Sequence, residues 1–115
     1  MRLPRVALAW LLLTGSSCAL AHAHLTGSAP AEGAHLATAP RVLELHFSEG
    51  AQLTALWIQK AGAERHKLGP LPGQAQQEVS VALPTLDAGE YLVSWRVLGS
   101  DGHVAPGQLH FSIDR

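Results

Sequence analysis

Apolar and polar residues alternate along most of the chain, which is the period-two pattern of half-buried β-strands. The segments that we expect to be strands are residues 25–28, 41–47, 53–59, 78–83, 90–98 and 108–114. In four of them every second residue is apolar and should face a core: Leu43, Leu45 and Phe47; Val79, Val81 and Leu83; Tyr91, Val93, Trp95 and Val97; Leu109, Phe111 and Ile113. Glycine and proline mark the corners between them.

The segment 53–59 is different, because it is apolar on both sides of Trp57. We expect Trp57 to anchor the core together with Trp95. No stretch after residue 21 keeps a 3.6-residue apolar period. Short alternating strands with Gly and Pro corners predict an all-β domain, an Ig-like or Greek-key antiparallel β-sandwich or barrel.

The first 21 residues depart from this pattern. A positive start with Arg2 and Arg5 precedes an apolar run at 6–13, which is too short to span a bilayer, and a stretch at 14–21 that ends in small residues. This three-part form predicts a helical secretory signal peptide, residues 1–21, cleaved from a domain of residues 22–115. Export to the periplasm follows from it.

The cleavage position has alternatives. The A-x-A site at 19–21 leaves His22 first, whereas the site at 21–23 leaves His24 first. Cys18 raises a third possibility, a lipoprotein terminus. Gly15 argues against it, because a large aliphatic residue is expected three positions before a lipidated cysteine.

Loss of the signal changes the chemistry that the chain can offer. Met1 and Cys18 are the only methionine and cysteine, so the remaining domain has no sulfur ligand and no disulfide. Two of the eight basic residues also leave, and six against nine acidic residues give a formal charge of −3. A mildly acidic domain is a poor nucleic-acid binder, since phosphate contacts need clustered Lys and Arg.

A metal site can be assembled from the new terminus and one loop. An N-terminal His22 offers its α-amine and a ring nitrogen. In Asp101-Gly102-His103, residues i and i+2 of an extended segment project to the same side, which adds a third nitrogen and an oxygen. Three nitrogens and an oxygen suit one Cu(II) ion, and without sulfur Cu(I) has little to hold it. The alternative for the loop is an ordinary polar turn in which Asp101 orients His103.

The other histidines are expected to be solvated. His46 and His110 occupy outward positions of predicted strands, and His35 and His66 lie in loop-like contexts. His24 is a special case. As the third residue after cleavage at Ala21, it could bind Cu(II) in a square plane with deprotonated backbone amides and leave Asp101 and His103 unused.

Six short motifs in order resemble the CopC family of periplasmic copper-binding proteins. They are His22-Ala23-His24-Leu25, Ser28-Ala29-Pro30-Ala31-Glu32-Gly33, Leu45-His46-Phe47-Ser48-Glu49, Leu86-Asp87-Ala88-Gly89-Glu90-Tyr91, Val93-Ser94-Trp95-Arg96-Val97, and Ser100-Asp101-Gly102-His103. The resemblance implies a Greek-key β-sandwich that binds Cu(II) through His22, Asp101 and His103. It also implies a copper carrier or buffer and an inner-membrane partner of the CopD type. Glu49 matches a family position near the site, as a neighbour rather than a ligand.

The resemblance has a departure and leaves competing functions. Some family members carry a methionine-rich loop for Cu(I), which this chain lacks. We expect a monomeric carrier rather than an enzyme. The first alternative is a polysaccharide-cleaving copper enzyme with an N-terminal histidine chelate, although Asp101 would fill a coordination position that such an enzyme leaves open. The second is an Ig-like adhesion module with incidental histidines.

Overall fold

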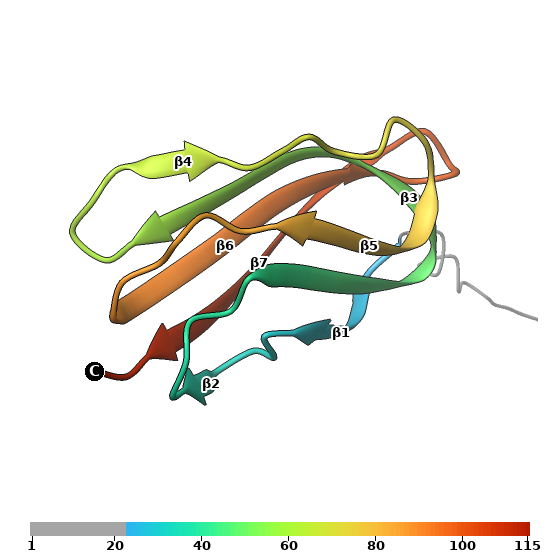
Figure 1. The fold of residues 1–115 in the computed structure, drawn as a ribbon. Coiled ribbons are helices and arrows are strands. Elements are labelled where there is room, and N and C mark those ends of the chain that lie inside the picture. The colour runs from blue at the N-terminus through green and yellow to red at the C-terminus, as the bar shows by residue number, and fades with distance from the viewer. Residues whose placement is uncertain (1–22) are drawn as a thin grey trace, which may run out of the picture.

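The strands account for nearly all of the ordered architecture in the computed structural model, which describes residues 23–115 (Figure 1). The described residues form seven strands: β1 (Leu25–Ala29), β2 (Ala34–Leu36), β3 (Val42–Lys60), β4 (Arg65–Lys67), β5 (Gln76–Ala82), β6 (Gly89–Leu98) and β7 (Val104–Ile113). Residues 23–115 contain no helix that could cross a membrane. The predicted signal peptide lies outside the described residues.

One long strand belongs to both layers of the fold. The first part of β3 lies between β1 and β5, and its second part lies between β4 and β6. β7 then pairs with β6, and β2 lies at the edge beyond β7. All of these pairs are antiparallel except β2 with β7. The sheet therefore curls through β3 into a sandwich, which confirms the predicted all-β class.

The core lies between the layers and uses the alternating residues that the sequence predicts. All thirteen inward residues expected from the four alternating segments are buried. Phe47 meets Trp95 edge-on at 6.4 Å between ring centroids, and Tyr91 stacks on Phe111 at 5.4 Å. Gly107 lies opposite Trp95 across the β6–β7 pair, where a Cβ atom would be 2.4 Å from the indole ring.

Two predictions about the extent of strands and one about the core were wrong. The segments 41–47 and 53–59 are one continuous strand, and the last strand begins at Val104 rather than at residue 108. Trp57 is not in the core. The register shifts between Leu53 and Ala55, so Leu56 and Ile58 face inward and Trp57 faces outward, where the Arg65 guanidinium lies 4.1 Å from its ring centroid. The bulge reverses the side that a strict alternation would assign.

The direction of β7 fixes the two ends of the molecule. It starts beside the β6–β7 loop and runs to the opposite end, where the chain terminates (Figure 1). Ten residues in a strand span about 30 Å. The start of β1 lies at the same end as the β6–β7 loop.

Candidate metal centre

The β6–β7 loop, residues 99–103, is closed by its own backbone. The Gly99 N–H donates to the His103 carbonyl at 2.9 Å, and the Gly102 N–H donates to the Gly99 carbonyl at 3.0 Å. Gly102 has φ +85°, a conformation that side chains disfavour. Glycine adopts this conformation readily, which lets the loop close with Asp101 and His103 on it.

Asp101 holds His103 with both carboxylate oxygens. Oδ1 accepts the His103 backbone N–H at 3.0 Å, and Oδ2 lies 3.1 Å from the ring Nδ1. The Asp101 side chain is only 21% exposed, whereas that of His103 is 73% exposed. The two side chains therefore lie together, as the i, i+2 spacing predicts. An ordinary polar turn with an aspartate-oriented histidine would make the same contacts, so the pair alone does not define a metal site.

The first described residues are fixed to the corner of β3. Ala23 is buried in the core at 6% exposure. The His24 N–H donates to Ser48 Oγ at 3.1 Å, and the His24 carbonyl accepts the Ser48 N–H at 2.8 Å. Leu25 then pairs with Phe47. His22, the predicted first residue and first ligand, lies outside the described residues and directly precedes Ala23.

The corner of β3 brings the residues that follow His22 and the Asp101–His103 loop to one end of the molecule. Ser48 pairs with His24, and four residues later Gln52 pairs with Leu98, the last residue before the loop. Four residues of extended strand span at most about 13 Å. Figure 1 shows the start of β1 and the β6–β7 loop at the same end. Residues some eighty positions apart in the sequence thus lie at the same end of the molecule.

Glu49 occupies this corner, next to Ser48. Its Oε2 atom is buried and has no hydrogen-bond partner among the described residues. A buried carboxylate oxygen without a partner is costly, because the lost hydration is not replaced. An ammonium, an imidazole N–H or a metal ion would each satisfy it. This orphaned oxygen is what we would expect beside an amine and a cation, so the corner fits a metal chelated by a terminal residue.

The described residues do not assemble a complete ligand set by themselves. Within residues 23–115, no group of three or more His, Cys, Asp or Glu side chains is arranged to hold a metal ion. In the predicted set, Asp101 and His103 would give two donors, and the remaining donors would come from His22, which lies outside the described residues.

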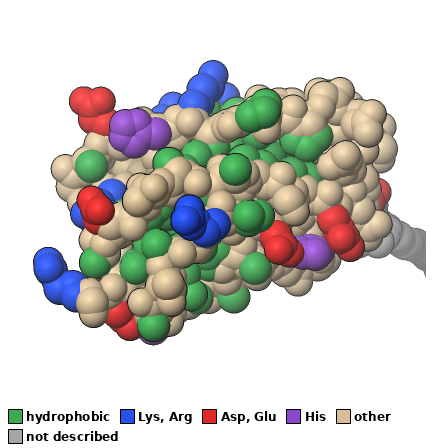
Figure 2. All heavy atoms as spheres, viewed as in Figure 1, with side chains coloured by type: hydrophobic (Ala, Val, Ile, Leu, Met, Phe, Trp, Pro, Cys, Tyr) green, Lys and Arg blue, Asp and Glu red, His purple; other side chains and the backbone are tan. Residues whose placement is uncertain are grey.

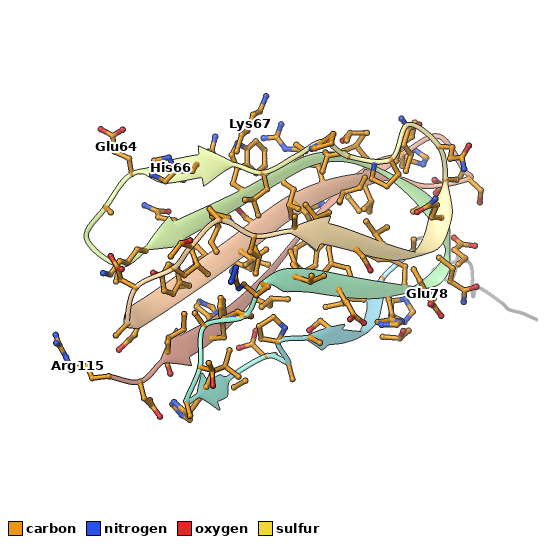
Figure 3. All side chains as sticks on the ribbon, viewed as in Figure 1. Glu64, His66, Lys67, Glu78 and Arg115 are labelled. Carbon is orange, nitrogen blue, oxygen red and sulfur yellow. The ribbon has the colours of Figure 1, made fainter. Side chains whose placement is uncertain are left out.

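The other histidines are distributed over the outer faces of the sheets. His46 lies between Glu44 and Glu78, and its ring nitrogens are 3.7 Å from a carboxylate oxygen of each. Figure 2 shows a histidine flanked by two acidic side chains on this face, and Glu78 is labelled in Figure 3. His110 contacts Glu32 at 3.4 Å. The outward positions predicted for His46 and His110 are confirmed.

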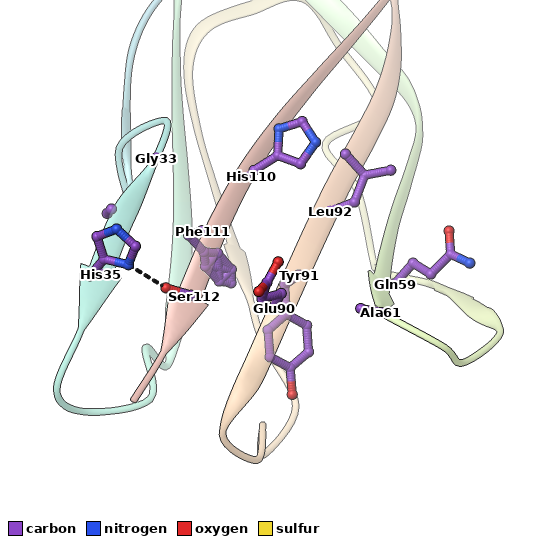
Figure 4. A pocket seen from close by; sticks show the side chains of 11 residues that line it. Gly33, His35, Gln59, Ala61, Glu90, Tyr91, Leu92, His110, Phe111 and Ser112 are labelled. Atoms are coloured by element: carbon purple, nitrogen blue, oxygen red, sulfur yellow. Dashed lines mark hydrogen bonds between the residues drawn. The ribbon is translucent and has the colours of Figure 1, made fainter. Parts of the chain in front are cut away.

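His35 and His66 are exposed, but they lie on the short strands β2 and β4 rather than in loops. His35 and His110 line a groove on the outer face of β6 and β7 (Figure 4). In this groove the His35 Nδ1 lies 2.7 Å from Ser112 Oγ. The His35 ring thus has a hydrogen-bond partner on β7.

Comparison with known proteins agrees with the fold and identifies the family. A CopC domain model matches residues 25–114. The chain is 36% identical to the protein YobA of Escherichia coli K12 over 98 residues, which cover 81% of this chain and 79% of YobA. It is 36% identical to copper resistance protein C of Pseudomonas syringae pv. tomato over 110 residues, which cover 85% of each chain. The crystal structure of CopC from Methylosinus trichosporium OB3b matches with a TM-score of 0.70 and 27% identity, over 81% of this chain and 94% of that one.

The chain is an all-β sandwich in which the Asp101–His103 loop and the start of the first strand lie at the same end. The family match makes the assignment specific: the chain belongs to the CopC family of copper resistance proteins. The resemblance inferred from the six motifs is confirmed.

Proposed function

We propose that this protein is a Cu(II) carrier or buffer in copper resistance or homeostasis, with one ion held by His22, Asp101 and His103. The observation that carries the proposal is the convergence at the β3 corner. There the segment that follows His22 lies at the same end as the Asp101–His103 loop, beside the buried Glu49 oxygen that lacks a partner among the described residues.

The donors select the oxidation state. His22 would contribute its α-amine and a ring nitrogen, His103 a ring nitrogen and Asp101 an oxygen. Such a nitrogen-rich, sulfur-free set suits Cu(II) in tetragonal geometry, and affinity among divalent ions rises toward copper. Asp101 currently contacts the His103 Nδ1, so this proposal has the Asp101 carboxylate turn from that nitrogen toward the ion. Binding weakens in acid, because protons compete for the same nitrogens.

The cellular setting is part of the same proposal. Residues 1–21 act as the signal peptide, and cleavage after Ala21 in the periplasm creates the amine that completes the site. The folded domain, residues 22–115, acts as a monomer and without catalysis. It passes copper to or from an inner-membrane transporter of the CopD type.

The decisive experiment is a copper titration of the exported protein after intact-mass analysis. The mass should correspond to a chain that begins at His22 and gains one copper ion. His103→Ala and Asp101→Asn should each weaken Cu(II) binding at least tenfold, in line with the loss of a metal-site group. His110→Ala is the matched control, because His110 is also an exposed histidine beside a carboxylate, that of Glu32.

Three results would contradict the proposal. A mature chain that begins at His24, or a lipidated Cys18, would remove His22 from the site. Equal affinities for the wild type and His103→Ala would exclude the loop as a ligand. Sustained peroxide or oxidised-glycan production with a reductant, lost in His103→Ala, would favour a copper enzyme instead of a carrier.

A further inference from the structure

The amino-terminal sequence contains two competing ways to bind one copper ion. In the proposed site, His22 joins Asp101 and His103. However, a chain that begins His22-Ala23-His24 can also use the amine, the two following backbone amide nitrogens and the His24 ring in a square plane. Both modes need the amine of residue 22, so one chain can use only one of them at a time.

Ser48 engages both backbone groups of His24. Its hydroxyl accepts the His24 N–H at 3.1 Å, and its own N–H donates to the His24 carbonyl at 2.8 Å. The square-planar mode would need the His24 amide nitrogen to lose its proton and turn toward the metal. The His24 amide cannot donate its proton to Ser48 and coordinate an ion at the same time. The Ser48 hydrogen bond therefore excludes the square-planar mode, and the square-planar mode breaks that hydrogen bond.

The burial of Ala23 acts in the same direction. Ala23 is part of the hydrophobic core, and Leu25 is already paired with Phe47. Square-planar binding would wrap residues 22–24 around the ion, with consecutive nitrogens on one side. Residues 23 and 24, which precede β1, are instead held by the core and by Ser48. The wrapped form would therefore pull Ala23 from the core as well as break the Ser48 contacts.

We propose that Ser48 is a specificity-determining residue, which keeps the His24 amide out of the coordination sphere and so directs Cu(II) to the Asp101–His103 loop. This inference rests on the proposed function, because it assumes a mature chain that begins at His22. Ser48 acts through the backbone of His24 and needs no contact with the metal. The same contact should exclude Ni(II), which forms stable square-planar amide complexes.

The test compares copper spectra of the folded protein with two references at neutral pH. A synthetic peptide of residues 22–27 represents the amide mode, and the His24→Ala protein can form only the loop mode. Visible circular dichroism and electron paramagnetic resonance of the wild type should match His24→Ala. Ser48→Ala should raise the share of the amide mode about fivefold, as expected for the loss of one hydrogen bond. Ser48→Thr, which keeps the hydroxyl, should resemble the wild type.

Two controls separate this role from a general effect on folding. Thr26→Ala removes another hydroxyl from the β1–β3 pair, one that donates to the His46 carbonyl and not to an amide of the terminal segment, and should leave the spectrum unchanged. The double variant Ser48→Ala with His24→Ala should return to the loop spectrum. A yellow, diamagnetic Ni(II) complex should form with Ser48→Ala and not with the wild type.

The outcomes distinguish this inference from the proposed function. If the wild-type spectrum changes in His103→Ala while Ser48→Ala still shows only the loop mode, the role of Ser48 is wrong and the proposed site stands. If the wild type gives the peptide spectrum and ignores His103→Ala, both are wrong. Failure of the wild type to bind Cu(II) would also refute both.

Discussion

Asp101 organises the loop through its two carboxylate oxygens, one on the backbone and one on the ring of His103. Gly99 makes room for this arrangement. A Cβ atom at residue 99 would lie 3.1 Å from Asp101 Oδ1 and 3.8 Å from the His103 carbonyl. The absence of a side chain at Gly99 thus leaves the space that the Asp101 carboxylate occupies.

Gly99→Ala should therefore displace the Asp101 carboxylate and weaken Cu(II) binding by about tenfold, the lower range for groups that orient a metal ligand. Isothermal titration with copper would measure it. Gly73→Ala is the matched control, since no atom lies within 4 Å of its added Cβ. Equal affinities in the two variants would show that the loop absorbs the methyl group without moving Asp101.

Tyr91 provides a pH-dependent property of the fold. Burial, and then the nearby charge of Asp87, raise the pKa of Tyr91 above its ordinary value of 10.0, although its hydroxyl donates to the Asp87 carbonyl at 2.8 Å. The unfolded state then loses this proton at lower pH than the folded state. The free energy of unfolding should consequently fall as the pH rises above about 10.

Tyr91→Phe should remove the part of the alkaline fall in the unfolding free energy that comes from Tyr91. It should also lower the unfolding free energy near neutral pH, because the hydrogen bond to the Asp87 carbonyl is lost. Urea unfolding of both proteins between neutral and alkaline pH would measure the two slopes. Parallel slopes would mean that Tyr91 titrates equally in the folded and unfolded states.

At the scale of elements, β3 explains most of the architecture. Its bend at residues 48–51 makes one strand a member of both layers. The part of β3 before the bend pairs with β1, and the part after it pairs with the end of β6. The β6–β7 pair then supplies the loop. Its packing depends on Gly107, which leaves space for the indole of Trp95.

Gly107→Ala should destabilise the domain by about 1–3 kcal/mol, the usual cost of overpacking a core. Thermal unfolding followed by tryptophan fluorescence would report it. The exposed neighbour offers a control, because Gln108→Ala should change the free energy of unfolding by less than about 0.5 kcal/mol. An unchanged unfolding midpoint for Gly107→Ala would mean that the Trp95 side chain can adopt another conformation without loss of stability.

The alternating pattern predicted the inward faces of the strands because burial follows a period of two wherever the ladder is regular. The expectation that Trp57 lies in the core was wrong, since segment 53–59 is apolar on both sides and a bulge decides which side faces inward. The alternating pattern also missed β2 and β4, which have three residues each and are too short to show a period.

The candidate site divides in the same way. Asp101 and His103 are two residues apart, so local spacing was enough to pair them. The contact between His24 and Ser48 joins residues 24 positions apart, and the burial of the Glu49 Oε2 atom depends on the β3 corner. Neither could be predicted before the strands were paired.

At the scale of the whole molecule, the proposed site depends on the exact start of the chain. Adding two residues, Gly-Ser, before His22 should block the α-amine and reduce Cu(II) affinity at least about a hundredfold, because a direct ligand matters more than the groups that orient one. The unfolding midpoint of the metal-free protein should not change. Competition with a colorimetric chelator would measure the affinity, and full retention of binding would exclude the amine as a donor.

The opposite placement of the β6–β7 loop and the carboxyl end has a practical consequence for building a copper sensor. A linker joined after Arg115 would leave the fold at the end of β7, about one strand length from His103. An electrode or bead attached there would carry the domain with its loop and first residues facing the sample. Attachment by the other end would bury the same surface against the support.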